Sequence, residues 1–114
     1  GPVISERCKP ELRNHTIETA GVLNKAGVPM CICTDHPVVP EQYLPLSAGL
    51  AVRGGLDRDE ALKAITIYPA QITGIADRVG SIEPGKDADI VIFSGDPLSV
   101  CDTPDMVIVN GTVI

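Results

Sequence analysis

Residues 27–37 form a short uncharged apolar run that ends on Asp35 and His36, and no other stretch limits the possible folds of this chain so strongly. A glycine and a proline bound the run, whose length is typical of a fully buried β-strand. Side chains alternate between the two faces of a strand, so Asp35 is predicted to share a face with Cys31 and Cys33. A carboxylate at the end of such a strand is a candidate catalytic residue. The alternative is an Asp that closes the following turn.

The chain has 114 residues, of which 44% are hydrophobic, which is ordinary for a globular protein with one core. A net charge of −6 leaves no basic stripe for phosphates, so a nucleic-acid partner is not expected. No apolar run approaches the roughly 18 residues of a membrane span, and no signal peptide is visible. We therefore expect a soluble, cytoplasmic protein. The chain does not begin with Met, and we expect it to be a piece of a longer one.

The four cysteines are predicted to be reduced and to act as small buried hydrophobic side chains. They are Cys8, Cys31, Cys33 and Cys101. Cys31 and Cys33 flank a single residue, which is too tight for the usual Cys-x-x-Cys zinc site. A metal site built from Cys31, Cys33 and His36 remains the alternative.

Residues 1–75 are predicted to alternate between helical and extended structure. Asp57 offers a helix cap, with acidic residues in the first turn and Glu60 three residues after the cap. Strand, helix and strand in succession predict two parallel strands with a right-handed crossover. The expected elements are a strand end at 1–5, a polar surface loop at 6–15, a helix at 16–27, a strand at 28–34, and helices at 41–53, 57–67 and 69–74.

Residues 76–114 are predicted to form antiparallel β structure. Asn110-Gly111 between two apolar runs is the strongest short hairpin signal. Pro84 and Gly85 stand where a type II turn prefers them. Phe93 is expected in the core of this part, with Asp87 and Asp89 at its surface or in turn hydrogen bonds. The expected strands are 79–82, 89–93, 106–109 and 112–114.

Several motifs in this order resemble the C-terminal end of the metal-dependent amidohydrolase superfamily, nearest to its imidazolonepropionase-like and Xaa-Pro-dipeptidase-like branch. The resemblance covers nearly the whole chain from about residue 16, and the Gly-x-Ile-x-x-Gly-Lys-x-Ala-Asp-x-Val pattern at 80–91 is its most specific part. The motifs are Gly-Val-Pro through Thr-Asp at 27–35, Asp-Glu-Ala-Leu-Lys-Ala-Ile-Thr at 59–66, Pro69-Ala70, Gly74-Ile75, the run 79–91, and Val-Asn-Gly at 109–111.

The resemblance implies an α/β fold: residues 1–75 would supply the last βα units of a (β/α)₈ barrel, and residues 76–114 a portion of a small antiparallel β-sandwich built from both ends of the longer chain. Residues 28–35 would then be the eighth barrel strand. Asp35 would ligate a divalent metal, which we expect to be zinc, and would take a proton from the water that attacks the carbonyl carbon of the C–N bond to be hydrolysed. The implied substrate is a small amide, cyclic amide or dipeptide.

Three further residues are candidates for substrate binding on this reading. His36 would face the mouth of the site, while Lys9 and Arg13 would lie in the loop after the seventh strand, where a cation can hold a substrate carboxylate. The alternative for all three is solvated surface. Tyr68 stands where the family usually has Asn, at a position that is structural in the family.

The family's His-x-His pair and its metal ligands on the middle strands have no counterpart in these 114 residues. One Asp cannot build a hydrolytic metal site. We therefore expect the segment to be inactive alone and to work as part of a longer enzyme, with the rest of the barrel, or a second copy paired through exposed strand edges, as its partner. The alternative is a non-catalytic α/β domain or scaffold that lacks a metal site.

Overall fold

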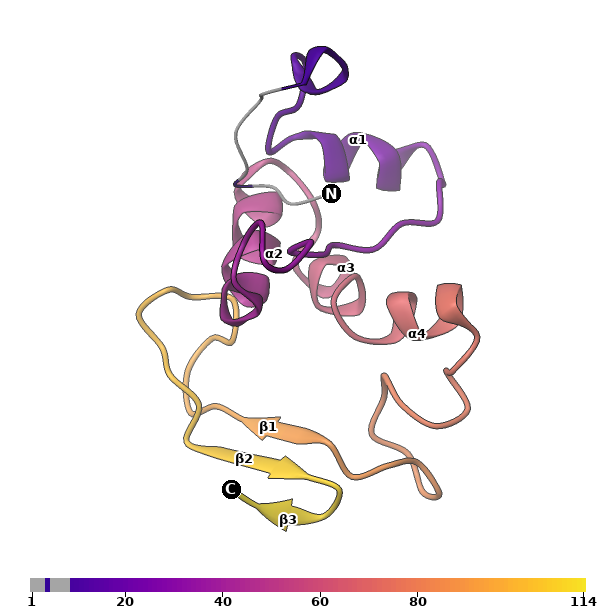
Figure 1. Ribbon diagram of the computed structural model, residues 1–114, viewed down its shortest axis with the longest axis vertical. Helices are drawn as coiled ribbons and strands as arrows, with labels where there is room; N and C mark the ends of the chain where they lie inside the picture. The colour runs from indigo at the N-terminus through magenta and orange to yellow at the C-terminus, as the bar shows by residue number, and fades with distance from the viewer. Residues whose placement is uncertain (1–3, 5–8) are drawn as a thin grey trace.

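Short helices occupy one end of the molecule and a small sheet the other, along a longest dimension of 44 Å (Figure 1). The structure is a computed structural model in which residue 4 and residues 9–114 are described. The predicted strand end at 1–5, the first part of the loop at 6–15 and Cys8 fall largely or wholly outside those residues. The elements are η1 (Pro10–Leu12), α1 (Thr19–Lys25), η2 (Glu41–Tyr43), α2 (Leu44–Arg53), α3 (Arg58–Lys63), α4 (Ile67–Thr73), β1 (Ile90–Ile92), β2 (Met106–Val109) and β3 (Thr112–Val113).

The helix boundaries follow residues that the sequence marks. The Asp57 carboxylate accepts the backbone N–H groups of Asp59 and Glu60 at 2.9 and 3.2 Å, so the predicted cap of α3 is confirmed. Gly74 ends α4 with a positive φ of 76°. The predicted end of the 57–67 helix is wrong, because the chain bends at Thr66 and α4 already begins at Ile67.

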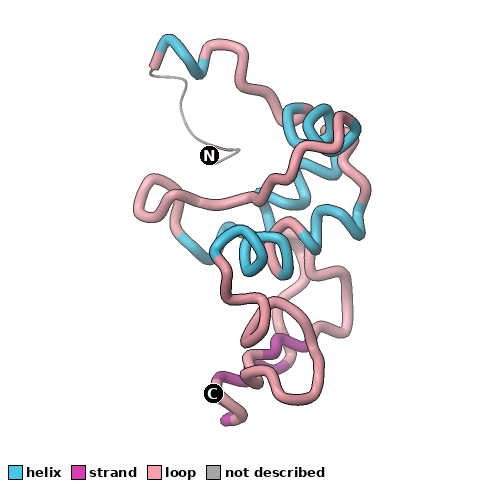
Figure 2. Tube along the Cα trace, turned by 90° about the vertical axis from the view of Figure 1, so that its right-hand side faces the viewer, coloured by secondary structure: helices cyan, strands magenta, loops and turns pink. Residues whose placement is uncertain are grey.

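Residues 28–34 run extended across the helices but are not a β-strand in this structure, which corrects the prediction (Figure 2). A strand requires a neighbour to complete its hydrogen-bond ladder. Within the part of the chain that the structure describes, the interior of this segment has a single backbone bond, from Ile32 N to Ala64 O at 3.0 Å.

The alternation predicted for that segment is nevertheless confirmed. Ile32 and Thr34 are 5% and 8% exposed and face the helices. Cys33 and Asp35 are exposed on the other face. The face of the segment that carries Asp35 is therefore exposed to solvent.

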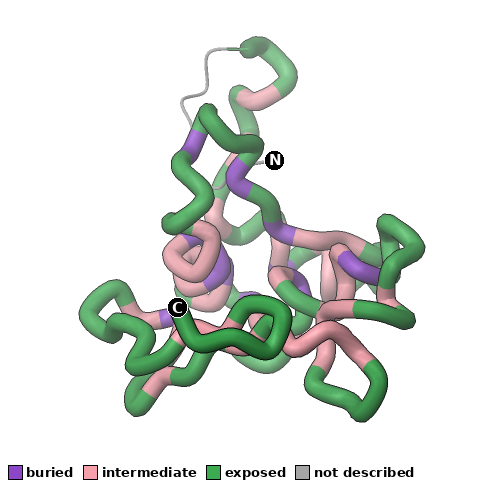
Figure 3. Tube along the Cα trace, turned by 60° about the horizontal axis from the view of Figure 1, so that its bottom comes forward, coloured by how far each residue is buried: buried purple, intermediate pink, exposed green. Residues whose placement is uncertain are grey.

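The core of the helical end is built mainly from alanines. Ile32 packs among small side chains from α2, α3 and the turn after α3, and Leu98 enters from the far part of the chain. Buried residues are concentrated in this end, whereas the strands of the sheet consist mainly of exposed residues (Figure 3). The buried cluster comprises Ile32, Ala48, Ala51, Leu56, Ala61, Ala64 and Leu98.

The sheet has the order β1-β2-β3 with both pairs antiparallel, as predicted for residues 76–114. Asn110 and Gly111 form the tight turn, with φ of 49° and 78°, and the amide of Asn110 donates to Asp89 at 2.8 Å. The turn at 83–86 is confirmed by the positive φ of Gly85 and by a bond from Lys86 N to Glu83 O at 3.2 Å. Asp87 pairs with Arg78 at 2.6 Å.

Two details of this part differ from the prediction. Residues 79–82 are not a strand, because Gly80 takes a positive φ of 94° and its backbone lies close to Ile67 and Ala70 of α4. Phe93 is only half-buried. The sheet therefore has little core of its own among the described residues.

The loop after β1 joins the sheet to the helices. The side chain of Leu98 is buried in the helical core. Its backbone lies so near α2 that a Cβ added to Gly49 would sit 2.5 Å from the Leu98 carbonyl oxygen. No helix within residues 9–114 is long and apolar enough to cross a membrane.

Candidate functional site

Asp35 lies where the extended segment turns toward η2. Its φ is 54°, a left-handed conformation that Asp tolerates better than most residues. The turn is closed by the main chain, since the Asp35 carbonyl accepts the amide of Val38 at 2.9 Å and the Thr34 carbonyl accepts that of Val39 at 3.2 Å. Within residues 9–114 the Asp35 carboxylate has no hydrogen bond or ion pair. It does not close the turn, and it is exposed and open to a ligand.

His36 follows in the same turn and is also exposed. The His36–Pro37 peptide bond is cis. Val39, by contrast, is buried at 4% exposure and anchors the far side of the turn. The turn therefore presents two adjacent polar side chains, Asp35 and His36, on a backbone held at both ends by buried residues.

Lys9 and Arg13 flank η1 and are both exposed. Two backbone bonds hold their loop: Leu12 N to Lys9 O at 2.9 Å and Arg13 N to Pro10 O at 3.3 Å. In Figures 1 and 2 this loop lies at the end of the molecule away from the sheet. Across the described part of the chain no hydrogen bond or ion pair joins either cation to Asp35 or His36. The structure does not bring the two pairs together.

The described thiols do not form a metal site with His36. Cys31, Cys33 and Cys101 are free, with Cys31 half-buried and Cys33 exposed on the Asp35 face. Residues 9–114 contain no group of three His, Cys, Asp or Glu side chains placed to hold a metal. Zinc in proteins is held by three or four protein ligands. Asp35 fits as one of them, and the described chain does not supply the others.

Two cavities lie away from Asp35. A groove of about 1100 Å³ runs between α2, α3 and the sheet, and its lining includes Tyr43, Leu62, Ile82 and Val91. A smaller cavity of about 320 Å³ opens beneath residues 27–30, beside α1 and α4, with Asn24, Glu60 and Tyr68 in its wall. None of the four candidate site residues lines either cavity.

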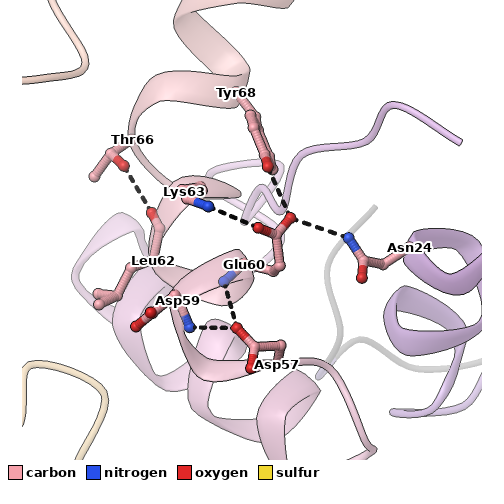
Figure 4. Close-up of polar contacts among 8 residues, drawn as sticks. All are labelled: Asn24, Asp57, Asp59, Glu60, Leu62, Lys63, Thr66 and Tyr68. Atoms are coloured by element: carbon pink, nitrogen blue, oxygen red, sulfur yellow. Dashed lines mark hydrogen bonds and ion pairs between the residues drawn. The ribbon is translucent and has the colours of Figure 1, made fainter. Parts of the chain in front are cut away.

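Among residues 9–114, Glu60 is the side chain with the most polar partners; from the sequence it was expected only as part of the cap of its helix. Its carboxylate accepts Asn24 Nδ2 of α1 at 3.1 Å, the Tyr68 hydroxyl of α4 at 2.7 Å, and Lys63 Nζ at 2.8 Å (Figure 4). The bonds from Lys63 and then Tyr68 lower the pKa of Glu60, and the bond to Glu60 raises the pKa of Tyr68. The unusual Tyr68 was the one sequence signal for this cluster.

Comparison with known proteins places these features in a family. A sequence model of the Amidohydrolase family matches residues 4–114. Amidohydrolase tasK of Hapsidospora irregularis is 35% identical over 104 residues, which cover 91% of this chain and 11% of that protein. An imidazolonepropionase of Geobacillus kaustophilus is 47% identical over 72 residues, covering 60% of this chain and 17% of that protein. The chain thus spans less than a fifth of either relative.

Solved structures share the fold of all or most of this chain. A crystal structure of an amidohydrolase from Thermotoga maritima MSB8 superposes with a TM-score of 0.94 at 41% identity, covering 100% of this chain and 30% of that one. A Xaa-Pro dipeptidase solved with methionine bound in its active site gives a TM-score of 0.75 at 26% identity, covering 88% of this chain and 25% of that one. The resemblance to the imidazolonepropionase and Xaa-Pro dipeptidase branch is confirmed.

Proposed function

Because this chain belongs to the amidohydrolase family, we propose that it is the carboxyl-terminal part of a longer divalent-metal-dependent hydrolase that cleaves a C–N bond in a small molecule. The observation that carries the proposal is the exposed Asp35 carboxylate. It stands at the end of a segment whose opposite face is packed on the helices, and it has no bonding partner within residues 9–114.

An exposed carboxylate at this place suits two tasks. It can hold a divalent metal through a carboxylate oxygen, and it can accept the proton of a water molecule that attacks a carbonyl carbon. The metal, which we propose to be zinc, would supply Lewis acidity at the carbonyl oxygen. The remaining ligands would come from other parts of the longer chain, so the segment alone would be inactive.

The remaining chain would also complete the fold. Residues 28–34 would gain neighbouring strands as a barrel strand, and the groove of about 1100 Å³ beside the open three-stranded sheet would receive strands of a β-sandwich. The division at residues 75 and 76 is part of this proposal. We also propose that the longer protein is cytoplasmic, in keeping with a substrate that is a small metabolite.

The proposed substrate class rests on the names of the relatives and on three candidate substrate-binding side chains of this chain. Imidazolonepropionase and Xaa-Pro dipeptidase are the names of two relatives, so a cyclic amide or a dipeptide is proposed. His36 lies beside Asp35 and would contact the substrate. Lys9 and Arg13 would hold a substrate carboxylate if the longer chain brings their loop over the site.

The test is an activity assay on the longer protein that carries this segment. Cyclic amides, simple amides and Xaa-Pro dipeptides are offered to enzyme treated with a chelator and then reloaded with zinc, manganese or cobalt. We expect hydrolysis of at least one class, lost on chelation and restored by metal. Failure to hydrolyse any class in every metal-loaded form would overturn the proposal and favour a non-catalytic scaffold.

A further inference from the structure

The Glu60 cluster connects three helices to the segment that leads to Asp35. Asn24 of α1 and Tyr68 of α4 both donate to Glu60 Oε2, and Lys63 donates to Oε1. The Glu60 side chain is 24% exposed, so these bonds are partly shielded from water. Figure 4 shows the three donors converging on this one carboxylate from different sides.

The start of the extended segment is tied to this cluster. Asn24 binds Glu60 through its side chain, and its backbone carbonyl accepts the amide of Gly27 at 2.9 Å. The next amide, that of Val28, donates to Leu23 at 3.0 Å. The end of α1 and the first residues of the segment are therefore one hydrogen-bonded unit, and Glu60 attaches that unit to α3.

The middle of the segment is tied to the same helix. Ala64 caps the C-terminus of α3, four residues after Glu60, and its carbonyl accepts the amide of Ile32 at 3.0 Å. The Ile32 side chain is buried in the cluster that contains Ala61 and Ala64. Thus α3 holds the end of α1, from which the segment starts, through the Glu60 side chain, and it holds the middle of the segment through a backbone bond.

Register matters for Asp35 because it lies three residues beyond Ile32, about 10 Å along an extended chain. A slip of one residue would exchange the two faces of the segment and turn Asp35 toward the helices. We propose that Glu60, with Tyr68 as its second anchor, is a positioning residue that fixes the register of residues 28–35 and so places the Asp35 carboxylate. This inference rests on the proposed hydrolase function.

Misplacing a catalytic group by about 1 Å can cost on the order of 100-fold in rate. In the longer enzyme, Glu60→Ala is therefore expected to lower kcat about 10- to 100-fold with a smaller change in KM, because of the proposed substrate contacts only that of His36 lies on this segment. Tyr68→Phe, which removes one hydroxyl, should lower kcat by a smaller factor. Glu60→Gln keeps one acceptor oxygen and should recover part of the loss.

The matched control is Arg58→Gln. Arg58 lies on the same helix and also makes a long-range pair, at 2.7 Å to Asp96, but that pair leads to the sheet and not to the segment. Arg58→Gln should leave kcat at the wild-type value even if it lowers the melting temperature as much as Glu60→Ala does. A fall in kcat that matched that of Glu60→Ala would mean that general loosening of α3 is responsible, and would overturn the proposal.

A direct measurement is the exchange of the Ile32 amide hydrogen in the same longer protein. Its rate should rise in Glu60→Ala and Tyr68→Phe, whereas that of the Leu56 amide, bonded to Ala51 at 3.0 Å, should not. Unchanged Ile32 exchange would overturn the positioning role even if kcat fell. If the longer protein hydrolyses no C–N bond, the function proposal fails, and the exchange comparison still decides whether Glu60 holds the segment.

Discussion

Arg58 and Asp96 form an ion pair across 38 residues of sequence, with Nη2 2.7 Å from Oδ1 and Nε 3.5 Å from Oδ2. The same Asp96 carboxylate accepts the amide of Leu98 at 2.9 Å, and Leu98 enters the helical core. One carboxylate thus fixes both the loop after β1 and its attachment to α3. This contact is one of several that join the loop after β1 to the helices.

That ion pair should make stability fall at acid pH. The hydrogen bond from Arg58, followed by that from Leu98, lowers the pKa of Asp96 below its ordinary value of 3.8. The stability that the charged Asp96 carboxylate contributes is therefore fully present above pH 3.8. It is lost as the pH falls through the lower pKa that Asp96 has in the folded protein. The urea midpoint of Asp96→Asn should lie below that of the wild type at neutral pH and approach it as the pH falls through the lowered pKa of Asp96.

Replacing Asp35 by Asn in the longer enzyme tests its catalytic role. Asn keeps the shape but cannot accept a proton, so kcat should fall roughly 10²- to 10⁴-fold. The melting temperature of the metal-free enzyme should hardly change, because the carboxylate is exposed and has no partner in residues 9–114. Both quantities are measured beside Asp77→Asn. A near-normal kcat would remove Asp35 from the site.

The cap of α3 should be measurable by itself. Asp57→Ala removes the acceptor of the Asp59 and Glu60 amides and should lower the free energy of unfolding by about 1 kcal/mol. Asp57→Asn retains a cap oxygen and should lose much less. Equal losses in the two variants, measured by chemical denaturation, would show that charge and not capping is responsible.

Gly49→Ala should destabilise the protein even though alanine is the better helix former by about 1 kcal/mol. The new Cβ would lie 2.5 Å from the Leu98 carbonyl oxygen, a backbone atom that cannot rotate away. Such overpacking costs about 1–3 kcal/mol. Denaturation of the variant measures the sign, and a gain in stability would mean that the loop does not rest on α2.

The sequence was informative wherever a local rule decides the conformation. Asp57 and Gly74 mark their helix ends, Asn110-Gly111 makes the hairpin, and the alternation around Ile32 is correct. Each of these depends on neighbours within a few residues. A short window of sequence contains all that is needed.

The predictions that were wrong concern segments whose conformation depends on residues distant in sequence. Residues 28–34 have a strand-like pattern without a neighbouring strand, and 79–82 bend because Gly80 packs against α4. The Glu60 cluster joins residues 36 and 8 positions away from it, which no local pattern predicts. For the candidate site, the sequence correctly predicted that Asp35 lies on the face opposite to Ile32. The position of Lys9 and Arg13 relative to Asp35 could not be predicted from their spacing in the sequence.

The alanine core has a consequence for how the chain can vary. Ala48, Ala51, Ala61 and Ala64 are each 0% exposed, so short side chains occupy these positions of the core around Ile32. A side chain larger by even one methylene has no space there without moving a helix. In a randomised library of these four positions, folded variants should carry mainly Ala or Gly, so the separation of the helices should vary little among them.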